Sequence, residues 1–134
     1  MKTILTTLIC LTVLMSCYSQ QTENSKNDRR VYNLISSYDH DTEKWSDWKK
    51  TDEVFVLNYM NKGAIARYRP NEKMILYKKK PNVPVEIGKT PKGKGYKIIT
   101  ARESFFEYTL KFYDDPSMGL ELNVGRIKLR FSKK

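Results

Sequence analysis

The sequence predicts an all-β domain: an antiparallel meander of about eight or nine short strands that closes as a small barrel, with a β-sandwich as the alternative. Apolar and polar residues alternate with a period of two in several segments, which is typical of strands with one buried face. Turn-forming residues recur every 8 to 12 positions. No ten consecutive residues show the 3.6-residue period of a helix. Short strands joined by tight turns are characteristic of small barrels and sandwiches.

The alternation is clearest near the C-terminus. It runs through residues 106–112, 120–124 and 127–131, which are separated by turn-rich segments at 114–119 and 123–125. Three consecutive half-buried strands follow from this pattern. We expect Phe106, Tyr108, Leu110, Phe112, Leu120, Leu122, Ile127 and Leu129 to be buried, and Glu107, Lys111, Glu121, Lys128 and Arg130 to be exposed.

Six earlier segments complete the predicted meander. Residues 54–60 are apolar on nearly both faces, as in a central strand, and Gly63 follows where a hairpin loop needs a left-handed residue. The other predicted strands are 31–38, 64–69, 73–78, 83–87 and 96–101, the last two joined by a long turn at 89–95.

The polar segment 39–53 interrupts the alternation and holds both tryptophans, Trp45 and Trp48. One helical turn would place the two indoles on the same side, where they could close one end of a barrel. This arrangement resembles the capping turn of lipocalin-type barrels in architecture only, because the G-x-W motif of that family is absent. We expect the pair to plug the core rather than to form a ligand platform.

The first nineteen residues predict an export signal. Lys2 is followed by an uncharged apolar run at 3–15, shorter than the about 20 residues of a membrane-spanning helix. The next motif, Leu14-Met15-Ser16-Cys17, resembles the lipobox of bacterial lipoproteins, although Met15 stands where that motif usually has a smaller residue. The resemblance implies acylation of Cys17 and anchoring to the cell-envelope membrane. Ordinary cleavage after Ser19 is the alternative, and it would give a secreted or periplasmic soluble protein.

Residues 20–29 contain no apolar side chain and predict a flexible tether in front of a single domain at 30–134. That domain is long enough to bury one modest core. The two cysteines of the chain, Cys10 and Cys17, both precede it. We therefore expect no disulfide bond within the domain.

The residues that most enzymes need are scarce. His40 is the single histidine, and no cysteine follows Cys17. Nucleophilic catalysis of the serine–histidine or cysteine–histidine kind needs a base beside the nucleophile, and a zinc site needs three or four ligands. Asp39, Asp41 and Glu43 are spaced like calcium ligands, but the turn glycine of a calcium loop is missing. The sequence therefore predicts no catalytic residue, metal site or cofactor.

Charge is distributed unevenly along the chain. Residues 62–102 hold twelve lysines and arginines but only two glutamates, a net charge of +10, while the rest of the chain is balanced. A barrel with one basic side would attract anionic partners, whereas a solvated face that only maintains solubility is the simpler interpretation. The candidate binding residues are Lys78, Lys79, Lys80, Arg67, Arg69, Lys92, Lys94 and Lys97.

Two hypotheses of function follow. The first is a lipid-anchored binding module of the cell envelope, whose basic face meets an anionic envelope surface or an acidic polysaccharide. The second is an inhibitor or structural component that acts through contacts with an unidentified protein. Nucleic acid is not an expected partner, because the chain is predicted to be exported and its aromatic residues are needed for the core.

Overall fold

The computed structural model describes residues 28–134, so the predicted signal, Cys17 and most of the predicted tether lie outside the described residues. The described part is all-β and has one short 3-10 helix, η1 (Pro116–Met118). Between Asp28 and Lys134 no helix is long and apolar enough to cross a membrane. The strands are β1 (Asp28–Asp39), β2 (Lys44–Trp45), β3 (Lys49–Tyr59), β4 (Ala64–Tyr68), β5 (Ile75–Lys79), β6 (Glu86–Lys89), β7 (Gly95–Glu103), β8 (Phe106–Tyr113), β9 (Leu120–Val124) and β10 (Ile127–Ser132).

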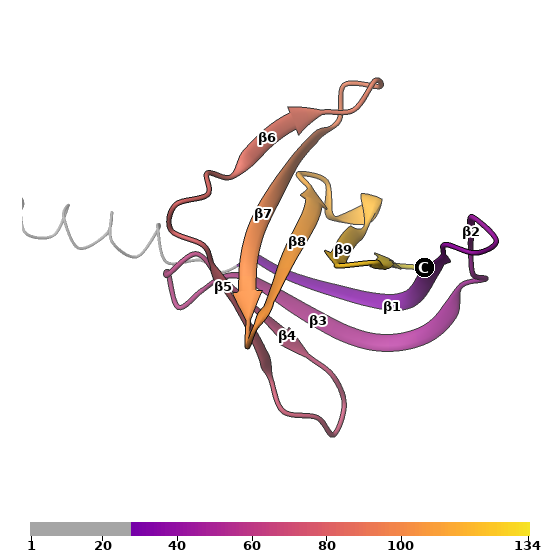
Figure 1. Cartoon of the computed structure of the whole chain (residues 1–134), viewed down its shortest axis with the longest axis horizontal. Coiled ribbons are helices and arrows are strands. Elements are labelled where there is room, and N and C mark those ends of the chain that lie inside the picture. The colour runs from indigo at the N-terminus through magenta and orange to yellow at the C-terminus, as the bar shows by residue number, and fades with distance from the viewer. Residues whose placement is uncertain (1–27) are drawn as a thin grey trace, which may run out of the picture.

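Eight of these strands form a closed antiparallel barrel, which confirms the predicted all-β meander and rules out the sandwich. Each barrel strand pairs with the next one along the chain, in the order β1, β3, β4, β5, β7, β8, β9, β10. The ring closes between β10 and β1, where Leu34 pairs with Ser132 and Ser37 with Leu129. The strand β2 folds back on the end of β1, and β6 pairs with β7 to form an arm that projects from the barrel (Figure 1).

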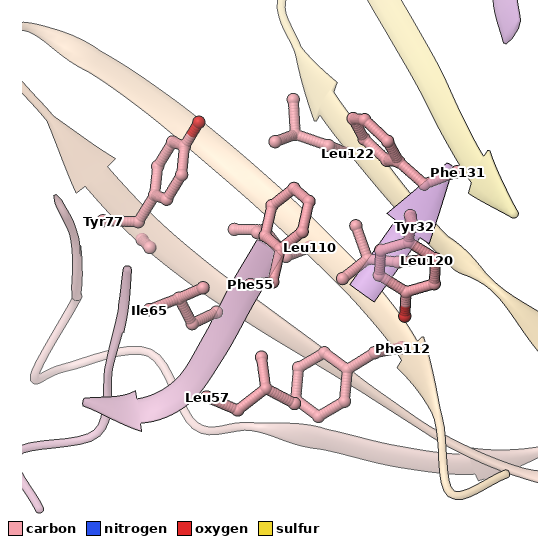
Figure 2. Close-up of a cluster of buried hydrophobic side chains, with 11 residues drawn as sticks. Tyr32, Phe55, Leu57, Ile65, Tyr77, Leu110, Phe112, Leu120, Leu122 and Phe131 are labelled. Atoms are coloured by element: carbon pink, nitrogen blue, oxygen red, sulfur yellow. The ribbon is translucent and has the colours of Figure 1, made fainter. Parts of the chain in front are cut away.

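Side chains from every barrel strand fill the interior (Figure 2). The rings of Tyr32, Phe55 and Phe131 pack against one another, with centroids 5.1 to 6.1 Å apart. Such aromatic contacts add to the free energy gained by burying apolar area. The fully or nearly buried apolar residues of this cluster are Tyr32, Phe55, Leu57, Ile65, Tyr77, Ala101, Leu110, Phe112, Leu120, Leu122 and Phe131.

The predicted facing of the three C-terminal strands is confirmed in their middle parts and wrong at two ends. The apolar residues Leu110, Phe112, Leu120 and Leu122 are buried, and Tyr108 and Leu129 are half-buried. Phe106 and Ile127 are instead 59% and 57% exposed. They are the first residues of β8 and β10, where the barrel wall ends and no neighbour covers the inward face. Of the residues predicted to be exposed, Lys111, Glu121 and Arg130 are only half-exposed.

The segment 39–53 contains no helical turn, and its tryptophans do not plug the core. Its residues form a turn, β2 and the start of β3. The backbone N–H of Ser46 donates to the carbonyl of Ser37, and the Ser36 hydroxyl donates to the carbonyl of Ser46. These bonds fold the segment over the outside of β1, because its polar groups are satisfied there and not in the apolar interior.

Candidate functional site: the open end of the barrel

The barrel wall is interrupted at the end where β1 begins. There β5 pairs with β7 only through Lys78 with Arg102 and Lys79 with Ala101. The chain then loops through residues 80–85, and β6 takes over the same edge of β7 at its opposite end. The strand β6 belongs to the projecting arm and not to the ring (Figure 1). The wall is therefore open between β6 and the β3–β4 hairpin.

A pocket of about 400 Å³ occupies this mouth. Two core residues, Leu57 and Phe112, form part of its lining and join it to the hydrophobic interior. On the arm, Ile87 is 78% exposed although it lines an apolar pocket. The lining comprises Leu57, Val85, Ile87, Ile99 and Phe112, together with Asp28, Asn58, Gly63, Lys79 and Lys97.

Positive charge dominates the rim of the mouth. The side chains of Lys79 and Lys97 are exposed, and neither forms an ion pair with any residue between 28 and 134. The one carboxylate of the rim, Asp28, accepts hydrogen bonds from Arg30 Nε at 3.1 Å and Nη2 at 2.9 Å. The Asp28 charge is therefore balanced by Arg30, and the two lysines give the mouth a net positive charge.

Arg30 also fixes the shape of this end. Its side chain is 5% exposed, and its Nη1 donates to the carbonyl of Tyr113 at 2.6 Å. The guanidinium lies 5.3 Å from the centroid of the Phe112 ring. Arg30 thus links the start of β1 to the end of β8 and holds Phe112 at the floor of the pocket.

Three of the eight predicted binding residues are engaged by acidic groups of the chain itself. The prediction that Arg67 binds an anionic partner is wrong. Arg67 is 7% exposed and points into the barrel, where it pairs with Glu53. Arg69 lies between Glu53, at 3.6 Å, and Glu72, at 3.1 Å. Lys80 donates to Glu107 at 2.7 Å, and this bond lowers the pKa of the Glu107 carboxyl.

The remaining predicted residues do not share one face. Lys79 and Lys97 meet at the mouth, and Lys78 lies beside it, where it lines a second hollow of about 470 Å³ with Met60 and Lys62. Lys92 and Lys94 are exposed in the turn at the tip of the β6–β7 arm. The predicted basic side is thus a basic end, centred on two of the eight residues.

The sequence pattern does not predict the apolar lining of the mouth. Ile99 and Lys97 alternate with Ile98 in a predicted strand, so their shared face was visible in the pattern. Their position opposite Leu110 and Phe112 depends on the register between β7 and β8. The projection of β6 away from the ring leaves no local signal in the sequence.

The single histidine, His40, follows the last residue of β1 and so lies away from the mouth, which is lined by the first residue of β1. His40 Nε2 contacts the carbonyl of Arg126, and its ring packs edge-on against Tyr38. Within residues 28–134, no group of three or more histidine, cysteine, aspartate or glutamate residues is arranged to hold a metal ion.

Comparison with known proteins gave no matching family model, no matching curated protein and no matching solved structure.

Proposed function

We propose that this protein is a binding module whose open end holds an anionic amphiphile. The apolar part of the ligand would lie against Leu57, Ile99 and Phe112, and its acidic head between Lys79 and Lys97. The observation that carries the proposal is the position of these two unpaired lysines on the rim of an apolar pocket. Binding, and not catalysis, is the role this combination supports best.

The size and lining of the pocket support this class of ligand. Its volume of about 400 Å³ falls within the roughly 300–1,000 Å³ of small-molecule sites, which are mostly apolar with a few placed polar groups. The lysine ammonium is a compact charge on a flexible stem and can follow a carboxylate or phosphate of variable position. The exposed Ile87 would be covered by the ligand.

The predicted lipid anchor would hold the mouth of the barrel close to a membrane. The described chain begins at Asp28, which itself lines the mouth. Cys17 precedes Asp28 by eleven positions, a segment that spans at most about 40 Å when extended. An acylated Cys17 would therefore keep the mouth near a membrane surface, where amphiphiles are available.

Displacement of a fluorescent long-chain fatty acid tests the proposal. We expect dodecanoate to displace the probe, and uncharged dodecanol to do so much more weakly. The double variant K79Q/K97Q should bind dodecanoate about tenfold more weakly, a loss of about 1.4 kcal/mol. The matched control K92Q/K94Q removes two lysines from the β6–β7 turn, outside the pocket, and should bind like the wild type. Equal binding by K79Q/K97Q, or equal competition by dodecanol, would contradict the proposal.

A second candidate function, contact with a protein partner, is favoured by the outer face of β1, β3 and β4. Val54, Val56 and Tyr68 line a shallow hollow of about 360 Å³ with Arg29. Nearby Val31 is 41% exposed, and Tyr68 is 38% exposed. An apolar patch beside an arginine fits an acidic protein surface. Val56→Asp should abolish such a contact in a pull-down from envelope extract and leave fatty-acid binding unchanged.

A further inference from the structure

The guanidinium of Arg130 is held between two indole rings on the outer wall of the barrel. Its Cζ atom lies 4.5 Å from the centroid of the Trp45 ring and 4.6 Å from that of Trp48. The strand β10 sets Arg130 opposite Ser36 of β1, and the β1–β2 hairpin carries Trp45 across it. A guanidinium stacked in this way is already ordered before any ligand arrives, so a ligand that binds it loses less conformational entropy.

The hydrogen-bonding capacity of Arg130 is unused within the described chain. Its Nε is buried without a hydrogen-bond partner, and no carboxylate of residues 28–134 lies within ion-pair distance of it. Glu121 is the residue directly opposite on β9, yet the two side chains do not pair. Opposite charges that lie side by side without pairing are consistent with a ligand that supplies the missing partners.

A second cation continues the row. Lys111 of β8 lies opposite Glu121, and its Nζ is 4.4 Å from the ring centroid of Tyr96 and 5.4 Å from that of Tyr113. The outer wall thus carries Lys111, Glu121 and Arg130 on three adjacent strands, with an aromatic platform at each cation. Adjacent strands are about 4.8 Å apart, so the backbone positions of Lys111 and Arg130 are separated by about 10 Å across β9.

A hollow of about 200 Å³ lies at the Arg130 end of this row. Trp48, Tyr113, Glu121 and Arg130 contribute to its lining. The Trp48 side chain is 42% exposed, so part of the indole is open to solvent. None of the residues that line this hollow lines the mouth of the barrel.

We propose that this row is a binding site for an acidic polysaccharide. A uronate carboxylate would take the two terminal nitrogens of Arg130, the sugar ring would pack on Trp48, and sugar hydroxyls would donate to Glu121. The carboxylate of a neighbouring sugar would reach Lys111. Bidentate binding of a planar carboxylate is the geometry that a guanidinium favours, and an indole offers a flat apolar surface for a ring.

The carboxylate at the centre of the row distinguishes a sugar from a nucleic acid. Glu121 accepts hydrogen bonds from hydroxyl groups, which every sugar unit supplies. An internal unit of DNA has no free sugar hydroxyl, so an oligothymidylate would bring phosphate charge near Glu121 without a hydroxyl donor for its carboxylate. The site is separate from the amphiphile pocket, and neither proposal depends on the other.

Intrinsic fluorescence reports on this site alone, because Trp45 and Trp48 are the two tryptophans of the chain. We expect a hexamer of galacturonate to change the tryptophan emission of the purified protein in a saturable manner. Its fully methyl-esterified form and a single-stranded oligothymidylate should bind at least tenfold more weakly. Arg130→Gln should weaken binding of the hexamer at least tenfold. Arg130→Lys keeps the charge but loses the planar fork and should also weaken it.

Matched variants separate the site from general charge. K92Q/K94Q removes two positive charges elsewhere and should bind the hexamer like the wild type. Glu121→Gln should lower the preference for the hexamer over the oligothymidylate, because it removes the carboxylate that accepts from the sugar hydroxyls. Far-UV circular dichroism and thermal melting identify the variants that fold. If Arg130→Gln does not fold, Arg130→Lys replaces it as the test variant. The proposal is overturned if the hexamer leaves the emission unchanged, if the ester binds as tightly, if the oligothymidylate binds more tightly, or if a folded Arg130 variant binds normally.

Discussion

Arg67 and Glu53 form an ion pair inside the hydrophobic core of the barrel. Arg67 Nε donates to Glu53 Oε1 at 2.6 Å, and the Glu53 side chain is 1% exposed. Thr51 donates to the other carboxylate oxygen at 2.9 Å, and Arg67 Nη1 donates to the Tyr77 hydroxyl at 3.3 Å. Burial disfavours the charge on Arg67, but Tyr77 and Glu53 together outweigh that effect and raise its pKa. Arg67 therefore stays charged in the folded barrel.

Loss of one partner of this pair should destabilise the protein strongly. In Arg67→Met the carboxylate of Glu53 stays buried without its main partner, and we expect the free energy of unfolding to fall by about 3–5 kcal/mol. The double variant Arg67→Met/Glu53→Leu should lose less than either single variant, because no charge is left unpaired in the core. Urea unfolding of the four proteins gives the coupling energy. If the loss of stability in the double variant equals the sum of the losses in the two single variants, the two groups act independently.

Truncating a side chain should cost more stability in the middle of β8 than at the start of β10. Leu110 is fully buried, so Leu110→Ala should lower the free energy of unfolding by about 2–5 kcal/mol. Ile127 is 57% exposed at the start of β10, and Ile127→Ala should change it by about 0.5 kcal/mol or less. Chemical denaturation of both variants measures the contrast. Similar losses at the two positions would mean that the inward face of β10 is covered in solution.

Ionisation of Tyr32 should weaken the fold at alkaline pH. Burial raises the pKa of Tyr32, and the charge of Arg30 only partly opposes this effect. Since the folded pKa lies above the unfolded value of about 10, the stabilising contribution is complete below that pH and is lost as the pH rises through the folded pKa. Tyr32→Phe cannot ionise, so its stability should decline less above pH 10, as followed by thermal melting.

The same variant tests the cost of the buried hydroxyl at neutral pH. The Tyr32 oxygen has no hydrogen-bond partner among the described residues. Removing it should therefore leave the free energy of unfolding unchanged or raise it by up to about 1 kcal/mol. A clear loss of stability at pH 7 would show that the hydroxyl has a partner in solution.

The lysines next to the mouth should contribute unequally to binding of anionic vesicles. Replacing Lys78 or Lys79 with Gln should each cost about 1 kcal/mol of binding at low salt, because both are exposed. Lys80→Gln should cost less, since Lys80 is already paired with Glu107. Co-sedimentation with phosphatidylglycerol vesicles at increasing salt measures these differences. Equal effects of all three substitutions would indicate that Glu107 does not hold Lys80 in solution.

The strands could be predicted from the sequence because their signal is local. Alternation at 106–112 and 120–124 reports which residues share a face, and the barrel uses those faces. The same alternation continues into Phe106 and Ile127, because a sequence pattern does not mark where the neighbouring strand ends. Arg67 lies two positions after Ile65, but the partner that allows its burial, Glu53, lies 14 positions earlier on another strand.

The candidate sites could be predicted only in part. Counting charges found Lys79 and Lys97 but also residues held by Glu53, Glu72 and Glu107, because ion pairs between strands depend on register. The spacing of Trp45 and Trp48 suggested a helical turn, but Trp45 ends β2 and Trp48 lies in the link before β3. Arg130 has no feature in the sequence that separates it from Lys128, and only the return of the β1–β2 hairpin over β10 gives it a stacked environment.

The seam between β1 and β10 determines when this protein can fold. Lys134 N donates to Asn33 Oδ1 across 101 positions, and β10 is the last barrel strand to leave the ribosome. Until it emerges, β1 and β9 are both open edges, and non-local pairing of this kind is slow to form. The arrival of this single strand covers both open edges at once and converts an open sheet into a barrel.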